Sequence, residues 1–117
     1  MSAHTFLPDM SLATWEIPDP GNGGALPVSQ CGIVSLVSAA AETRTLADPV
    51  RSGLLLGLAF KTDGGDCVVT AASDVTMSSG DDVMTFADAG DFVLLMSIAV
   101  GTGFKWRQIV NHGAALT

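Results

Sequence analysis

The sequence predicts an all-β fold: a compact sandwich, jelly roll or barrel of about six to eight short strands with an extended N-terminal arm. Three observations favour this class. Short apolar runs recur at roughly 8–12 residue intervals, and turns rich in Gly, Asp and Ser separate them. No segment repeats its apolar residues with the period of an amphipathic helix. Prolines crowd the first 31 residues, which also hold the turn Asn22-Gly23-Gly24, so we expect a Pro/Gly-rich arm over 1–31 and a β domain over 32–117.

The arm combines two properties that rarely occur together. It holds four of the five prolines, which exclude long helices and central strands. It also carries more large apolar side chains than a solvated tail tolerates. These are Phe6, Leu7, Leu12, Trp15, Ile17 and Leu26. We therefore expect the arm to lie on a protein surface, either of its own subunit or of a neighbour by arm exchange.

Short strands are expected throughout the remainder. In the first strand, Ile33 and Val37 share one face, while Val34 and Leu36 share the other. Gly57 inside the second strand indicates a bulge or a close backbone contact. The expected strands cover residues 33–38, 54–60, 67–72, 74–77, 83–87, 92–100 and 104–110, and the Thr-Arg-Thr segment 43–45 also favours an extended chain.

The strand from Phe92 to Val100 is the most unusual element. It is apolar on both faces apart from Ser97, whereas a half-exposed antiparallel strand alternates apolar and polar residues. We expect the domain's own core to cover one face, and another subunit or an exchanged arm to cover the other. The turn Asp88-Ala-Gly-Asp91 is expected to join 83–87 and 92–100 as a hairpin.

The last long strand carries candidate contact residues. Strict alternation places Phe104, Trp106 and Val110 on one face and Lys105, Arg107 and Ile109 on the other. Because Trp and Arg are enriched at interface hot spots, two interpretations stay open. Either Trp106 is a core residue beside two solvated cations, or the cations face acidic groups of a partner or of the arm. The candidate subunit or capsid interface residues are Phe6, Trp15, Ile17, Phe92, Leu94, Lys105, Trp106 and Arg107.

Composition excludes several classes of partner. The formal net charge of −7 argues against a phosphate-binding or nucleic-acid-binding surface. Only 15% of the residues are charged, which suits a chain that hides part of its surface in an oligomer. The N-terminus lacks the features of a signal peptide, and no apolar run approaches the ~18 residues of a membrane span. We expect neither nucleic acid nor membrane as a partner.

The sequence also favours a protein without catalytic, cofactor or metal sites. It contains no Gly-x-Ser-x-Gly elbow, and its histidines, His4 and His112, stand far apart in the chain. Cys31 and Cys67 lack metal-type spacing and are expected as free thiols, although a disulfide between them stays open. Several turn aspartates offer oxygen atoms to calcium but form no known binding loop. They are Asp63, Asp66, Asp81, Asp82, Asp88 and Asp91.

Three segments resemble a group of small tailed-bacteriophage structural proteins. They are Gly32–Leu46 (GIVSLVSAAAETRTL), Thr85–Phe92 (TFADAGDF) and the spaced residues Trp106-Arg-x-x-x-Asn-x-Gly-x-x-Leu-Thr117. The likeness covers roughly 32–117 and leaves out the arm. It implies a capsid decoration, or cement, protein that forms trimers on the capsid exterior and clamps adjacent major capsid protein subunits. It brings no catalytic or ligand-binding motif.

We therefore expect a non-enzymatic virion protein that is made in the bacterial cytoplasm and stabilises a capsid as a homotrimer. Its partners would be further copies of itself and the major capsid protein. The alternative is a fibre or receptor- and glycan-binding β module, for which the absence of tyrosine and the two tryptophans are unfavourable. A small β-barrel enzyme would instead require a cluster of titratable groups in one pocket.

Overall fold

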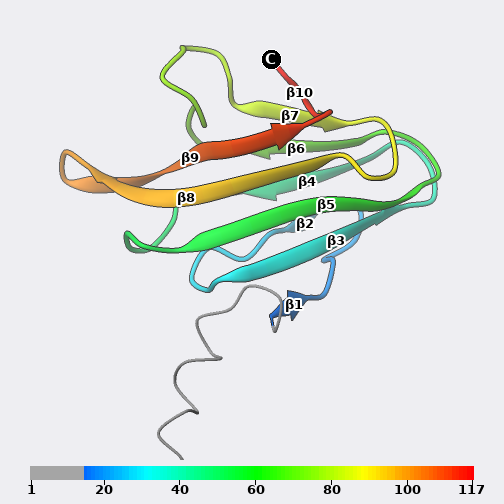
Figure 1. Cartoon of the computed structure of the whole chain (residues 1–117), viewed down its shortest axis with the longest axis horizontal. Helices are drawn as coiled ribbons and strands as arrows, with labels where there is room; N and C mark the ends of the chain where they lie inside the picture. The colour runs from blue at the N-terminus through cyan, green and yellow to red at the C-terminus, as the bar shows by residue number, and fades with distance from the viewer. Residues whose placement is uncertain (1–14) are drawn as a thin grey trace, which may run out of the picture.

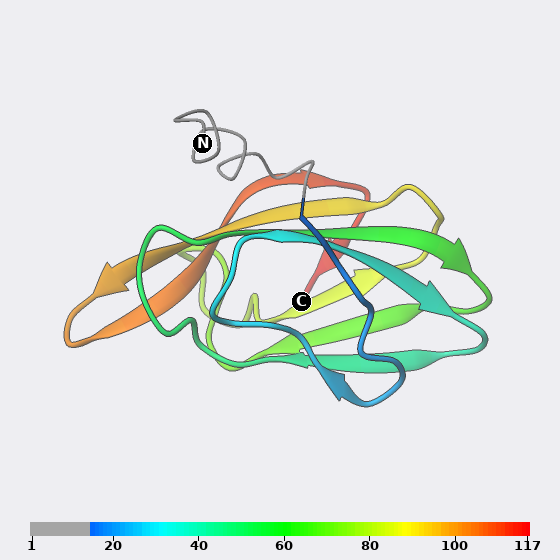
Figure 2. The same ribbon diagram turned by 90° about the horizontal axis from the view of Figure 1, so that it is seen from below.

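The computed structural model describes residues 15–117, and this part of the chain is a β-sandwich without helices. Two mixed sheets of five strands pack face to face, as Figures 1 and 2 show from two directions. Sheet A has the order β1 (Glu16–Ile17), β3 (Gly32–Ser38), β5 (Leu55–Asp63), β8 (Phe92–Val100) and β9 (Gly103–His112). Sheet B has the order β10 (Ala115–Leu116), β7 (Val83–Phe86), β6 (Cys67–Ala71), β4 (Glu42–Leu46) and β2 (Gly24–Ala25). The expected all-β class is confirmed.

The first six strands alternate between the two sheets. Consequently β1, β3 and β5 run parallel in sheet A, and β2, β4 and β6 run parallel in sheet B. Parallel neighbours need a crossover connection, and here the strand of the opposite sheet supplies it. The later pairs β5–β8, β6–β7, β8–β9 and β7–β10 are antiparallel. The chain is thus wound around the core before hairpin-type pairing completes each sheet.

The parallel winding stacks core residues in rows. In sheet A, Ile17 pairs with Val34, Val34 with Leu58, and Leu58 with Val93, and all four side chains are buried. Across the sandwich, Val69 and Met84 form a corresponding buried row of sheet B. Burying an aliphatic side chain of this size stabilises the fold by about 1.5–3 kcal/mol. The sandwich therefore has its own core, and β8 contributes Val93 and Leu95 to it as expected.

Two local expectations are wrong. The segment 88–91 does not close a hairpin, because it carries the chain from β7 in sheet B to β8 in sheet A. Its ends are held by Asp91, whose carboxylate accepts the N–H groups of Ala87 and Asp88 at 3.1 Å. Residues 74–77 form no strand. Val75 is buried there, and its carbonyl accepts the Gln108 N–H at 2.7 Å, so this loop covers part of the β9 edge.

A β-bulge changes the faces of β9. Leu94 pairs with Val110 and Leu95 pairs with Gln108, which leaves Ile109 without a partner in the ladder. Strict alternation placed Val110 on the face of Trp106. Because one extra residue shifts all later side chains to the opposite face, Val110 lies on the outer side with Leu94. The expected face assignment therefore fails beyond Gln108.

The expected arm over 1–31 lies only partly within the described residues, since residues 1–14 fall outside them. Residues 15–31 contain β1 and β2, which are the outermost parallel strands of their sheets. Ile17 and Leu26 from this segment are buried in the core. This part of the expected arm thus packs against its own subunit.

Candidate interaction surface

The outer side of sheet A is an apolar face. Its residues alternate with the core residues along the strands, and they are half-buried or exposed. Register places them in rows, for example Ile33, Gly57, Leu94 and Val110 across four strands. Val37 is 43% exposed and Met96 is 36% exposed. We define the apolar face as Ile33, Val37, Leu55, Ala59, Phe92, Leu94, Met96, Ile98 and Val110.

Phe92 and Gly57 form the tightest contact of this face. Phe92 pairs with Ala59, two residue pairs away from Gly57 in the ladder. A β-carbon added at Gly57 would stand 3.1 Å from the Phe92 ring and 3.2 Å from the Ile33 side chain. The expected close contact at Gly57 is therefore a side-chain ring over the glycine. This packing keeps Phe92 half-buried on the outer side of the sheet.

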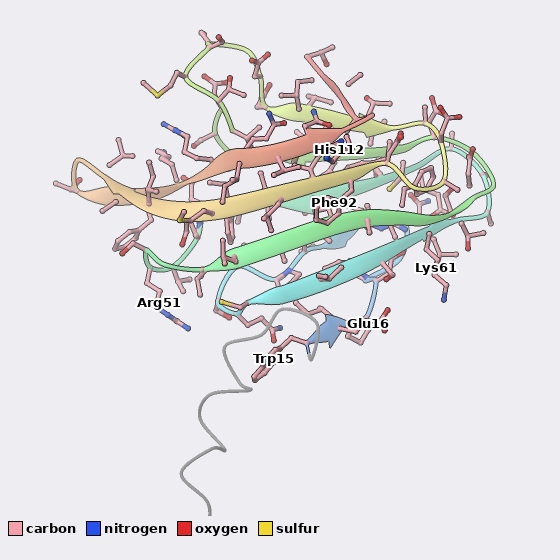
Figure 3. The ribbon with its side chains drawn as sticks, in the orientation of Figure 1. Trp15, Glu16, Arg51, Lys61, Phe92 and His112 are labelled. Atoms are coloured by element: carbon pink, nitrogen blue, oxygen red, sulfur yellow. The ribbon has the colours of Figure 1, made fainter. Side chains whose placement is uncertain are left out.

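Charged and polar side chains surround the apolar face. Figure 3 looks onto it, with Phe92 in the middle, Arg51 and Lys61 toward opposite ends, and Glu16 along the β1 edge. His112 lies beside Phe92 in the ladder of β8 and β9. An apolar centre with a polar rim is the usual composition of a protein–protein interface.

Lys105 and Arg107 make polar contacts within their own subunit. Lys105 Nζ lies 3.2 Å from Asp48 Oδ2 and 2.9 Å from Ser73 Oγ. Arg107 Nη1 donates to the Asp74 carbonyl at 3.0 Å. The Lys105–Asp48 pair is partly exposed, and such pairs stabilise little. Both cations attach loops to β9, so their structural role is to position residues 47–48 and 73–74.

The other sequence candidates are divided between core and surface. Trp106 is 2% exposed, and its Nε1 donates to the Ala47 carbonyl at 3.0 Å. Ile17 is also in the core, so neither side chain offers a surface to a partner here. Phe92 and Leu94 lie together on the apolar face. Trp15 is 40% exposed next to β1, and Phe6 lies outside the described residues.

Two clefts flank β1 at the edge of sheet A. One of about 240 Å³ is lined by Trp15, Ser29, Gln30, Cys31, Arg51 and Leu54. The other, of about 410 Å³, is lined by Glu16, Ile17, Pro18, Asp19, Ser35, Val37 and Lys61. The first joins an exposed indole to polar groups, and the second continues onto the apolar face at Val37. The first cleft therefore lies where β3 and β5 begin, and the second lies along β1 and β3.

A buried ion pair network supports the same edge from inside. Arg44 of β4 is fully buried, and its guanidinium donates to both carboxylate oxygens of Asp19 and to Glu42. The same group donates to the carbonyls of Val37 and Thr43. Burial raises the pKa of Asp19, but hydrogen bonds from Arg44, Val37 and the turn outweigh it, and the pKa lies below its usual value. The carboxylates are occupied by Arg44, so this network is structural.

Sheet B presents a different outer side. Its outward positions carry small or β-branched uncharged residues, in register across the strands. They are Ala25, Thr43, Thr45, Val68, Thr70, Val83, Thr85 and Ala115. This threonine face has no large apolar side chain such as Phe92 or Met96. The two outer surfaces of the sandwich thus differ in chemistry, and the apolar face is the one that resembles an interface.

Among residues 15–117, no group of three or more His, Cys, Asp or Glu side chains is arranged to hold a metal ion. Cys31 and Cys67 are free thiols, and burial raises the pKa of the Cys67 thiol. In the same part of the chain, no helix has the length and apolarity to cross a membrane.

No family model matches this chain, and the comparisons with curated proteins and solved structures found no match. The residues that carry the phage resemblance can nevertheless be located. Asn111 exchanges two hydrogen bonds with Ala114, and Gly113 has a φ of +94° beside the Asp91 carboxylate. Together with the buried Arg44 and Trp106, these residues build turns and core. The residues that carry the resemblance therefore shape the fold, and they do not indicate which outer surface contacts a partner.

Proposed function

We propose that this chain is a non-enzymatic virion structural protein that decorates and cements a bacteriophage capsid. The observation that carries the proposal is the apolar face on the outer side of sheet A. In this proposal the protein acts as an oligomer, a homotrimer by resemblance, and binds between major capsid protein subunits on the capsid exterior. The motif segments within 32–117 support the phage assignment through their resemblance to small phage structural proteins.

The dimensions of the apolar face suit such a role. The four strands that carry the face span ~14 Å and nine residues extend ~30 Å, which gives a surface of ~420 Å². The largest apolar patch of a monomeric protein is about 300–600 Å² and is often functional. Covering this face removes it from water and adds stability to whichever assembly covers it. A cement protein that binds only the assembled shell stabilises that shell relative to its separated subunits.

Analysis of purified particles tests the proposal. The protein should be present in near-stoichiometric ratio to the major capsid protein, and particles that lack it should release their genome at lower temperature. Met96→Asp, which places a charge on the apolar face, should lower attachment, while Thr70→Asp on the threonine face should not. Absence of the protein from particles would refute the assignment.

A fibre or receptor-binding β module remains the second candidate, because the cleft at Trp15 joins an exposed indole to Ser29, Gln30 and Arg51. Sugars bind against aromatic rings with polar neighbours. In a glycan-array experiment, Trp15→Ala should then abolish binding and Met77→Ala, an exposed apolar control, should not. Retention of binding by Trp15→Ala, or absence of binding by the intact protein, would eliminate this candidate.

A further inference from the structure

We propose that residues 1–14 of one copy pack on the apolar face of a neighbouring copy. This inference rests on the oligomeric state in the proposed function and is independent of the capsid partner. The segment would cover the apolar face, whose large side chains are partly exposed in a single subunit. Three properties of the molecule lead to it: the chemistry of the segment, the direction of the chain at Trp15 and the size of the face.

The segment matches the surface in chemistry. Residues 1–14 include Phe6, Leu7, Met10 and Leu12, and Asp9 is the only acidic residue among them. The segment contains no lysine or arginine. The apolar face offers side chains of the same kind, and Lys61 and Arg51 lie toward its two ends in Figure 3. Apolar contact at the centre and a cation near Asp9 at the rim are therefore mutually compatible.

The direction of the chain favours a neighbour. Trp15 precedes β1 directly, and its carbonyl accepts the Ile33 N–H at 2.8 Å. Because β1 is parallel to β3 and begins opposite Ile33, a straight continuation from Trp15 passes the start of sheet A. Reaching its own apolar face would require a reversal at this hydrogen-bonded residue. Fully extended, 14 residues span ~46 Å, which exceeds the ~19 Å width of the sheet.

The size of the face also calls for an additional element. Stable interfaces bury about 800 Å² on each partner. The ~420 Å² of the apolar face falls short of this area even if the whole face is covered. An apolar segment that crosses from one copy to the next adds contact without enlarging the domain. The arm and the face together then reach the area of an ordinary specific interface.

Photo-crosslinking with isotope mixing tests the assignment. One full-length chain of natural isotope content carries p-benzoylphenylalanine at position 6. It is mixed with a second full-length chain that is ¹⁵N-labelled and has the natural Phe6. The expected products are cross-linked peptides of mixed isotope, joining position 6 to residues 55–59 or 92–98. Cross-links confined to one isotope, or joined to strands β4, β6 or β7, would overturn the inference.

Matched variants separate docking from folding. Met96→Asp should remove the mixed-isotope products and weaken self-association about tenfold or more, while Thr70→Asp should leave both unchanged. Equal melting temperatures of the two variants establish that the fold persists. Retention of the products by a folded Met96→Asp chain would contradict the proposal. If the chains cross-link as expected but are missing from particles, the capsid assignment alone is refuted. If the protein is present on particles but gives no mixed-isotope cross-links, this inference alone is refuted.

Discussion

Arg44 and Asp19 form a two-point ion pair inside the sandwich, with Nε and Nη2 each 2.8 Å from a different carboxylate oxygen. Asp19 lies between β1 and β2, whereas Arg44 lies on β4. The pair therefore joins the outermost winding of the chain to the next one. It also neutralises a guanidinium that has no exposed surface.

Asp19→Asn should destabilise the fold by about 3 kcal/mol, because it leaves the buried Arg44 charge with the partial compensation of Glu42 alone. Urea unfolding measures the change. Asp63→Asn, at the exposed end of β5, is the matched control and should change stability by less than about 0.5 kcal/mol. An equal, small effect of both substitutions would show that the ion pair contributes little.

Acid should weaken the protein through the same pair. In the folded state, hydrogen bonds from Arg44 and from the Val37 and Gly21 N–H groups outweigh burial and hold the pKa of Asp19 below its ordinary value. The stabilisation is thus complete above the unfolded-state pKa and is lost as the pH falls below that value and through the folded-state pKa. Unfolding free energy measured between neutral pH and strong acid should fall in this window, and the fall should be smaller in Asp19→Asn. An unchanged acid dependence in the variant would assign the effect to other carboxyls.

The two cysteines should differ in reactivity. Burial raises the pKa of the Cys67 thiol, and its side chain has no exposed surface. Cys31 is half-buried and lines the cleft at Trp15. A thiol reagent at neutral pH should therefore modify Cys31 first and reach Cys67 only after unfolding. Mass spectrometry of labelled peptides measures the order, and early labelling of Cys67 would contradict the buried position.

Gly57→Ala should destabilise the domain by about 1–3 kcal/mol, because the new β-carbon must displace the Phe92 ring or the Ile33 side chain. Thermal unfolding records the loss. Gly103→Ala in β9 is the control, since no atom lies within 4 Å of its added β-carbon. A neutral Gly57→Ala variant would mean that Phe92 moves freely on the apolar face.

Trp106→Ala should cost about 3–5 kcal/mol of unfolding free energy, because it leaves a cavity in the core and an unpaired Ala47 carbonyl. Denaturant unfolding provides the value. Trp15→Ala removes an exposed indole and should cost much less. A small stability change with lost assembly in Trp106→Ala would instead indicate an interface role for the ring.

Composition and turn spacing predicted the all-β class and most strand positions, because these depend on local propensity. The inner and outer faces of Phe92–Val100 also follow from simple alternation. The winding between sheets could not be predicted, because the turn at Asp88–Asp91 has the same residues whether the chain returns within a sheet or crosses over. Ile109 as a bulge and Arg44 as a buried cation depend on pairing partners that are distant in the sequence. The apolar face was predicted only for β8, since its full extent requires the strand order.

Three of the four edge strands are short, and the fourth, the ten-residue β9, is partly covered by the loop at Val75, whose carbonyl accepts the Gln108 N–H. β1, β2 and β10 have two residues each, so an approaching strand finds only a short row of free backbone groups at these edges. Parallel windings with long open edges could add copies end to end and grow without limit. In this protein the short strands and the loop over β9 leave few backbone groups free for such edge-to-edge growth.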